Sequence, residues 1–360
     1  MLNRVKPFGI ILLLFANLGT LLLFYFAKPV DFSWNTNVLV IVSQVLSLIG
    51  TVYLSLSFLL SSRFSFLEKM IGGLDIVYKI HHMLGALSFI ALLHHPLLLA
   101  VGKIPNTQLA LRYFIPAENI GYNFGIYALA AMTLLLLFTL FVQLPYHIWK
   151  NLHSGMGIVL LFGMLHIFFI TSDVSRFMPL QIWMFFWMSF GLISFIYKYF
   201  FYQKYQDAYK YCIKEVIDFG NYVEIILLSN TSKRMKYCSG QFIFLSTNNK
   251  TVGKESHPFS IASGPDEEYL KLYCKKLGDY TNRLSLLQSG EEVVINGPYG
   301  TFFESIPMRK DIVGIAGGIG ITPFLSLLKN QKQISKKNLT LFHIVRKKSD
   351  SFLDNNIIST

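Results

Sequence analysis

Six long apolar runs constrain this 360-residue chain more than any other feature of its sequence. Each run approaches the roughly 20 residues that an α-helix needs to cross the hydrocarbon core of a bilayer. The first run is too long for the apolar core of a signal peptide, and no small-residue cleavage site follows it, so we interpret it as a membrane helix. The sequence therefore predicts six transmembrane helices, at Pro7–Ala27, Val38–Leu60, Ile80–Val101, Tyr122–Val142, Gly155–Thr171 and Leu180–Phe201.

Charged residues divide the chain into two parts. Residues 1–205 hold 12 of the 32 lysines and arginines and 5 of the 20 acidic residues, although they form more than half of the chain. Because 53% of all residues are hydrophobic and only 14% are charged, an ordinary soluble enzyme is excluded. The net charge of +12 comes from scattered residues without a basic patch or arm, so we expect the lipid bilayer as a partner and no nucleic acid.

The lysines and arginines of the connecting segments predict the orientation. With a cytoplasmic N-terminus, the inner connections carry eight of these residues and the outer ones carry four. Six spans then leave the second part of the chain in the cytoplasm. Its three cysteines, Cys212, Cys238 and Cys274, lack CxxC spacing, which fits a reducing compartment and argues against a disulfide framework or a zinc site.

Histidines recur inside two of the apolar runs, where an ionisable side chain is costly and points to a function. His81 and His95 are 14 residues apart in the third run, which corresponds to about 21 Å along a helix and only about 40° around it. His153 and His166 of the fifth run are 13 residues apart, so an ideal helix would separate them by about 140°. Local overwinding at a glycine of that run (Gly155, Gly157 or Gly163) could absorb this mismatch, or the planes of the two ligands could differ.

Paired histidines at two depths are typical of haem ligation. Neutral imidazoles suit iron, and two of them from facing helices can hold a haem from both sides. The predicted orientation places His81 and His153 near the inner side, and His95 and His166 near the outer side. The pattern thus predicts two stacked bis-histidine haems, with polar helix-packing histidines as the alternative. The adjacent His82 and His94 leave a one-residue ambiguity in the third run.

The second part of the chain begins with alternating strand-like runs that predict a small antiparallel barrel. Within it lie the segments His257-Pro258-Phe259-Ser260-Ile-Ala-Ser263 and Lys275-Lys-Leu-Gly278-Asp-Tyr-Thr281. A flavin needs a small hydroxyl near its reactive nitrogen, for which Ser260 is a candidate, and cationic and polar donors for its pyrophosphate. Ser263, Lys275 and Thr281 are candidates for the phosphates. The alternative is that these residues only form turns.

A glycine loop follows the barrel, between an apolar strand over residues 311–316 and a helix-like segment. Its residues Gly317, Gly318, Gly320, Thr322 and Pro323 predict a cradle for a phosphate at the start of a helix. A second strand over residues 339–345 ends at Arg346, which could pair with the 2′-phosphate of NADPH or be a solvated charge. Only two strands of such a nucleotide fold are visible, so we expect this domain to be incomplete.

These segments together resemble the ferric reductase and NADPH oxidase family of transmembrane flavocytochromes. His81 and His153 each precede a glycine by four positions, Pro96 follows His95, and the segments HPFS, GDYT and GGIGITP come in the order of that family. The resemblance implies two b-type haems held by the third and fifth helices, a ferredoxin-reductase-type FAD barrel, and an NAD(P)H-binding α/β domain. It implies haem ligation by His81, His95, His153 and His166, within domains at 1–205, 206–305 and 306–360.

The resemblance also implies a function. Electrons from cytoplasmic NAD(P)H would pass through FAD and the two haems to a small-molecule acceptor outside a bacterial inner membrane. We expect a ferric chelate as the acceptor, because Leu99 stands where the family's oxidases have an outer histidine and because Arg112 and Arg176 make the outer loops cationic. Superoxide production is the first alternative. The others are a membrane haem protein with a relic nucleotide domain and a quinone-linked cytochrome component.

Overall fold

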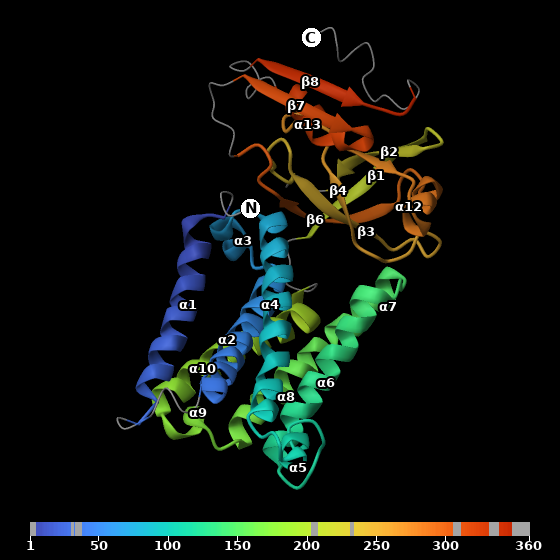
Figure 1. Cartoon of the computed structure of the whole chain (residues 1–360). Helices are drawn as coiled ribbons and strands as arrows, with labels where there is room; N and C mark the ends of the chain where they lie inside the picture. The colour runs from blue at the N-terminus through green and yellow to red at the C-terminus, as the bar shows by residue number, and fades with distance from the viewer. Residues whose placement is uncertain are drawn as a thin grey trace. The chain divides into compact units, whose positions relative to one another are not determined.

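The computed structural model describes residues 5–29, 32, 38–202, 208–230, 234–304, 311–330 and 338–347. The chain forms two compact units, Met1–Tyr205 and Gln206–Thr360. The first is helical, and the second contains the strands (Figure 1).

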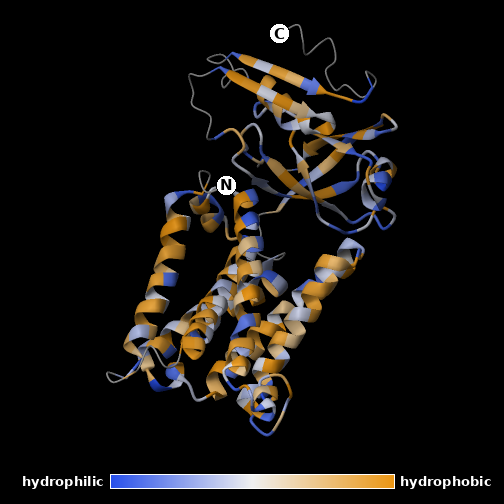
Figure 2. Ribbon diagram, in the orientation of Figure 1, coloured by the Kyte–Doolittle hydropathy of each residue, from blue (hydrophilic) through white to orange (hydrophobic). Residues whose placement is uncertain are grey.

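Six helices of the described residues are long and apolar enough to cross a membrane. This confirms the predicted transmembrane bundle, and Figure 2 shows that these helices are hydrophobic along most of their length. Short helices lie in the connections: α3 (Ser65–Ile71), α5 (Thr107–Leu111) and α9 (Asp173–Arg176). The spans are α1 (Pro7–Phe26), α2 (Val38–Ser61), α4 (Leu74–Val101), α6 (Ile120–Phe141), α7 (Tyr146–Ser154) with α8 (Met156–Phe169), and α10 (Met178–Ile196) with the π-helix η2 (Tyr197–Phe201).

Helix α2 packs against α4 and α10, and its second half is almost entirely buried. Glycines allow this close approach, since Gly50 of α2 lies against α4, and Gly191 of α10 lies against Ser55 of α2. Helices α1 and α6 instead expose large apolar side chains, such as Leu18 at 62% and Leu134 at 55%. Such surfaces suit contact with lipid and not with water.

Helix α4 begins at Leu74, before the predicted start of the third span at Ile80. Gly72 and Gly73 have φ values of 127° and 110° and separate α4 from α3. The first turns of α4 bury apolar residues in the bundle, but they also contain Asp75 and Lys79. Because these charges interrupt the apolar run, the predicted span starts too late.

The second unit contains an antiparallel barrel of six strands in the order β4-β3-β6-β1-β2-β5. An isolated bridge between Ile261 and Leu272 joins the two edges of the sheet, which confirms the predicted barrel. The short α12 (Asp279–Arg283) and η3 (Leu284–Leu286) follow β5. The strands are β1 (Ala208–Asp218), β2 (Tyr222–Ser229), β3 (Phe242–Thr247), β4 (His257–Ser260), β5 (Leu270–Lys275) and β6 (Glu292–Tyr299).

A parallel pair of strands follows the barrel in the same unit. Strand β7 (Ile312–Gly317) leads through η4 (Gly318–Ile321) into α13 (Thr322–Leu328), and β8 (Leu339–Ile344) pairs with β7. This strand–loop–helix–strand order is the one that the sequence predicted, with strand ends that differ by one residue.

Candidate functional site

Helices α4 and α7 bring together the two histidines that were predicted to form the inner pair. The ring centroids of His81 and His153 lie 6.4 Å apart, and Trp149 stacks on the His153 ring at 5.4 Å. Bonds of about 2 Å from both sides of one metal ion would put two imidazole centres roughly 6 Å apart. The spacing of this pair is therefore compatible with two imidazole ligands of one iron.

Helix α2 supplies a partner for both predicted haem ligands of α4, His81 and His95. His81 Nδ1 lies 2.9 Å from both the hydroxyl and the carbonyl oxygen of Ser57. His95 Nδ1 lies 2.8 Å from the hydroxyl and 3.1 Å from the carbonyl oxygen of Ser43. The two serines are 14 residues apart, as the two histidines are, so the antiparallel helices keep one register at both depths. A protonated Nδ1 that donates to a carbonyl leaves Nε2 as the metal-binding nitrogen.

The histidines of the fifth span have partners on α6. His166 Nδ1 lies 2.7 Å from the carbonyl oxygen of Gly121, and His153 Nδ1 lies 3.5 Å from the Thr139 hydroxyl. Gly125 makes room for His166, because a Cβ at that position would come within 2.8 Å of Nδ1. All four rings are thus held through Nδ1 by a neighbouring helix.

The fifth span is overwound at Gly155, between α7 and α8. The amide of Gly155 donates to the carbonyl of Leu152, and the amide of Ile158 donates to that of Gly155, which are i→i−3 contacts typical of a 3₁₀ turn. Such a turn changes the angle between His153 and His166 from that of an ideal helix.

The second pair, which was predicted to be the outer one, borders a cavity of about 330 Å³. His95 and His166 both line it, and most of its wall is apolar, including Met132 and Met188. Toward the loops its wall includes Tyr113, Tyr122 and Arg176. In the described part of the chain, no three His, Cys, Asp or Glu side chains gather as a metal cluster.

The neighbouring histidines of α4 point elsewhere. His82 and His94 are exposed, and His94 Nδ1 bonds to the carbonyl oxygen of Ile90 in its own helix. The geometry therefore favours His81 and His95 over their neighbours.

An ion-pair network borders the same cavity. Lys28 and Asp173 lie 2.6 Å apart with side chains only 4% and 7% exposed, and Asp173 also accepts from Arg176 at 2.7 Å. The Arg176 side chain itself is 65% exposed. It therefore presents positive charge to the surroundings at the edge of the cavity.

The predicted flavin residues fall on the barrel around β4 and the end of β5. Ser260 pairs with Phe242 across β4 and β3 and is half-buried, whereas Pro258 is exposed and Phe259 is buried. The His257 ring stacks on Tyr280 at 3.9 Å, which links β4 to α12. Burial raises the pKa of the Tyr280 hydroxyl above its usual value.

Lys275 and Thr281 flank an exposed turn. Lys275 ends β5 and is exposed, and the Thr281 hydroxyl accepts from the amides of Leu277 and Gly278 at 3.0 Å. The turn is therefore held in shape by its own threonine, and the Lys275 ammonium can reach an anion in solution.

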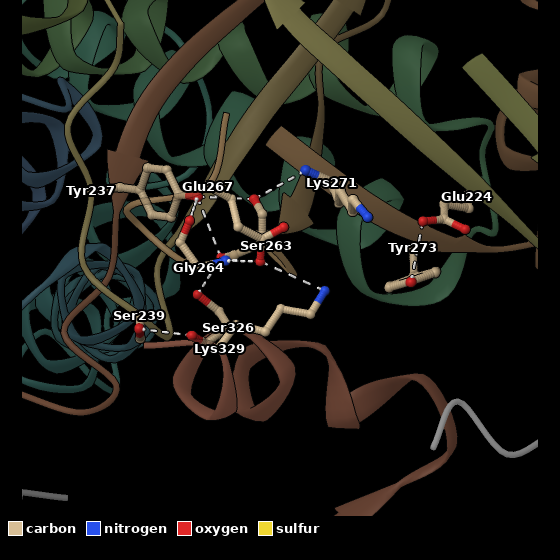
Figure 3. Close-up of polar contacts among 10 residues, drawn as sticks. All are labelled: Glu224, Tyr237, Ser239, Ser263, Gly264, Glu267, Lys271, Tyr273, Ser326 and Lys329. Carbon is tan, nitrogen blue, oxygen red and sulfur yellow. Dashed lines mark hydrogen bonds and ion pairs between the residues drawn. The ribbon is translucent and has the colours of Figure 1, made fainter. Parts of the chain in front are cut away.

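Ser263 differs from the other predicted phosphate residues because it is fully buried. Figure 3 shows its polar contacts with Tyr237, Lys271 and Ser326. Its hydroxyl lies 2.9 Å from the Tyr237 hydroxyl and accepts from the Lys271 amide, and its carbonyl accepts from Ser326 of α13 at 2.7 Å. Burial raises the pKa of Tyr237 to about 12, so this hydroxyl is protonated. These contacts make Ser263 the link between the barrel and α13.

The glycine loop is open where a phosphate was predicted. A Cβ built on Gly317, Gly318 or Gly320 would meet no heavy atom within 4 Å, and Gly318 has a φ of 51°. The Thr322 hydroxyl donates to the carbonyl of Ile319, and Pro323 stands at the start of α13. Arg346 is exposed just beyond β8. The sequence did not single out His343, whose Nε2 lies 3.0 Å from the Gly318 carbonyl.

Two family models match separate parts of the chain. The model of a ferric reductase like transmembrane component matches residues 46–165, and that of an FAD-binding domain matches residues 214–302. The matches follow the order in which the bundle and the barrel occur.

Curated relatives are similar over about a quarter to a third of this chain. A superoxide-generating NADPH oxidase heavy chain of Dictyostelium discoideum is 31% identical over 127 residues, which cover 30% of this chain and 24% of that protein. NADPH oxidase 1 of Mus musculus is 33% identical over 98 residues, which cover 25% and 16%. Respiratory burst oxidase homolog protein B of Solanum tuberosum is 32% identical over 122 residues, which cover 26% and 14%. The matched region thus spans less than a quarter of each of these proteins.

Solved structures resemble less than half of the chain. A ferredoxin NADP⁺ reductase from Neisseria gonorrhoeae, with bound FAD and NADP, aligns with a TM-score of 0.37 at 21% identity, over 42% of this chain and 63% of that one.

Proposed function

Because the chain belongs to the ferric reductase and NADPH oxidase family of transmembrane flavocytochromes, we propose that it passes electrons from cytoplasmic NAD(P)H through FAD and two b-type haems to an acceptor outside the membrane. The observation that carries the proposal is the arrangement of four histidines as two pairs at two depths, each ring held through Nδ1. A structural role for the histidines would not require such pairing.

His81 with His153, and His95 with His166, would hold the two haems. A bound haem supplies reversible one-electron chemistry at its iron. Ser57, Ser43, Gly121 and Thr139 fix the ring planes and keep Nε2 unprotonated. Contacts of this kind orient ligands and raise their basicity. The largely apolar wall of the cavity beside His95 and His166 would give a haem there a surrounding of low polarity.

Ser260, Lys275, Gly278 and Thr281 would bind FAD, together with the β4 backbone at His257, Pro258 and Phe259. FAD links a two-electron hydride donor to one-electron carriers. The exposed ammonium of Lys275 can neutralise the pyrophosphate, while the half-buried Ser260 can donate a hydrogen bond to the ring. The open glycines Gly317, Gly318 and Gly320 would allow the phosphate of a nicotinamide nucleotide to approach the backbone. Thr322 and Pro323 shape the loop at the start of α13. Arg346, which follows β8, would pair with the 2′-phosphate of NADPH.

A ferric chelate is the proposed acceptor. Arg176 lies at the edge of the outer cavity with an exposed guanidinium, and Arg112 is exposed in the same set of loops, so positive charge would steer an anionic chelate. Oxygen is the second candidate. It is favoured by the polar tyrosines Tyr113 and Tyr122 at the cavity and by the superoxide-generating relative.

The test compares two initial rates of the purified, haem-loaded chain supplied with NADPH. We expect ferric chelate reduction under argon to exceed superoxide release in air, and Arg176→Ala to slow the first rate severalfold by weakening steering. A larger superoxide rate that is unchanged in Arg112→Ala and Arg176→Ala would replace the ferric acceptor by oxygen. If neither rate depends on NADPH, the proposed electron path itself is wrong.

A further inference from the structure

His153 is held differently from the other three histidines of the two pairs. Nδ1 of each of the others lies 2.7 to 3.1 Å from a main-chain carbonyl oxygen of a neighbouring helix. Nδ1 of His153 instead lies 3.5 Å from the Thr139 hydroxyl, which is longer than a usual hydrogen bond. That hydroxyl donates to the carbonyl of Leu135, so it offers His153 only a lone pair. One long contact of this kind restrains a ring plane weakly.

A tryptophan of the same helix covers the His153 ring. Trp149 precedes His153 by four residues in α7, a spacing that puts both side chains on one helix face. Their ring centroids lie 5.4 Å apart, and their planes are inclined by only 18°. This is the offset-stacked arrangement that aromatic rings prefer. Stacking therefore restrains the plane of the imidazole that the contact with Thr139 leaves weakly held.

The two rings of this histidine pair are crossed. The planes of His81 and His153 are inclined by 73°, with the ring centroids 6.4 Å apart. The His81 ring is fixed from α2, because its Nδ1 lies 2.9 Å from both side-chain and main-chain oxygens of Ser57. The His153 ring follows the plane of Trp149. The angle between the two imidazoles thus depends on two separate contacts, one from α2 and one within α7.

The angle between two imidazole ligands affects the iron that they share. Each imidazole interacts most strongly with the iron d orbital that lies across its own plane. Parallel imidazoles act on the same d orbital and separate it in energy from its neighbour, whereas crossed imidazoles act on two d orbitals and leave them close in energy. A low-spin ferric haem with crossed ligands consequently has a strongly anisotropic EPR spectrum with one very large g value. The orientation of the ligands is one way in which a protein adjusts a haem.

An anchoring role would explain a tryptophan here without any function toward His153. Trp149 is half-buried near the start of the fifth span, and aromatic side chains often anchor membrane helices at the bilayer surface. An anchor needs an aromatic group at a suitable depth but no particular ring plane. Phe141 is a matched case, since it is 77% exposed at the end of α6, and only residues 142–145 separate it from α7.

We propose that Trp149 is a positioning residue, which holds the His153 imidazole crossed with that of His81 and so sets the ligand geometry of the haem between them. This inference rests on the proposed function, because it concerns a haem bound by this pair. It adds a residue that touches the ligand and not the iron.

The experiment records EPR spectra of the full oxidised chain in detergent, together with the haem retained per chain. All samples carry His95→Ala, so that His81 and His153 are the pair that remains intact. The variants are Trp149→Leu, which removes the stacked ring, and Trp149→Phe, which keeps an aromatic ring. Phe141→Leu is the matched control for the loss of an aromatic side chain at this end of the bundle.

We expect one strongly anisotropic low-spin signal, which Trp149→Phe and Phe141→Leu preserve. Trp149→Leu should lower the largest g value, because the freed ring can turn toward the plane of His81, and should weaken haem retention about tenfold. A signal typical of parallel ligands before Trp149 is changed would overturn the proposal. An unchanged spectrum in Trp149→Leu, or equal changes in Trp149→Leu and either of the other two variants, would also overturn it.

A measurement without haem separates this inference from the proposed function. In the haem-free chain, the ring current of Trp149 should shift the NMR signals of the His153 ring protons, which His153→Ala identifies. Trp149→Leu should remove the shift, and Phe141→Leu should keep it. If the chain binds no haem, the proposed function fails. The shift then still decides whether Trp149 holds the His153 ring, and its absence would overturn the positioning role.

Discussion

Each membrane histidine uses one ring nitrogen within the protein, and this decides what the other nitrogen can do. Nδ1 is engaged by a carbonyl or hydroxyl oxygen in His81, His95, His153 and His166. Such contacts fix the tautomer and the ring plane before a metal binds. Their loss should therefore weaken ligation without removing a ligand.

Gly125→Ala tests this at the outer pair. The new methyl group would lie 2.8 Å from His166 Nδ1, so the ring must move away from the Gly121 carbonyl. We expect retention of one haem to fall about tenfold or more while the other haem stays bound. Haem content per chain and the spectrum of the reduced protein measure both.

Gly102→Ala is the control for this change, because its methyl group would have the carbonyl oxygens of Leu98 and Leu99 at 3.5 Å as its nearest neighbours, an ordinary contact. Replacing glycine by alanine favours the helical conformation by at most about 1 kcal/mol, so a loss of haem that is confined to Gly125→Ala cannot come from helix propensity. Equal haem content in the two variants would contradict the role assigned to the His166 contact.

The short helices between the membrane spans carry charged residues, which are costly inside the spans themselves. Helix α3 contains Glu68, whose pKa burial raises to about 7. Because the pKa of Glu68 is higher in the folded protein than in the unfolded chain, folding favours its neutral form. The contribution of neutral Glu68 to the stability of the folded protein is complete below about pH 4.5 and is lost as the pH rises through 7.

Glu68→Gln should remove this pH dependence. Between pH 5 and pH 8.5 we expect the wild type to lose up to about 3 kcal/mol of stability relative to the variant. Thermal unfolding of both proteins in detergent at several pH values measures the difference. Glu118→Gln, which removes the carboxylate of an exposed residue, should follow the wild type. Parallel curves for the wild type and Glu68→Gln would refute the expectation.

The elements could be predicted from the sequence where one physical signal dominates. Apolar length gave the six spans, and alternation with turn residues gave the barrel. The start of α4 at Leu74 was missed because its buried first turns contain charges, although Gly72 and Gly73 marked the boundary. The family resemblance is confirmed by the two matched domains.

The partners of the candidate site were harder to predict. Ser43 and Ser57 could be found only once the register between α2 and α4 was known, because their spacing alone is common in apolar helices. Ser263 is a plausible phosphate ligand in sequence, but its burial depends on how α13 packs on the barrel. Such facts arise from tertiary packing, which local patterns do not contain.

For the whole molecule, the proposed path places FAD first, the inner haem second and the outer haem third. Loss of one carrier should therefore stop electrons from reaching the carriers that follow it. Light with EDTA can reduce bound FAD directly, which starts the path at the flavin without a nucleotide. In the wild type both haems should then become reduced. In His81→Ala, which keeps His95 and His166, we expect flavin reduction to be unchanged and the remaining haem to stay oxidised, since His95 lies about 20 Å further along α4 than His81.

His95→Ala is the complementary variant, because it removes a ligand of the other pair. It keeps the inner pair, so the remaining haem should be reduced from the flavin at the wild-type rate, while an external ferric chelate receives few electrons. The two variants each lose one haem and differ only in which one, so a general effect of haem loss would slow both alike. Rapid reduction of the remaining haem in His81→Ala would show that electrons reach the outer pair without the inner one, and the serial order would have to be abandoned.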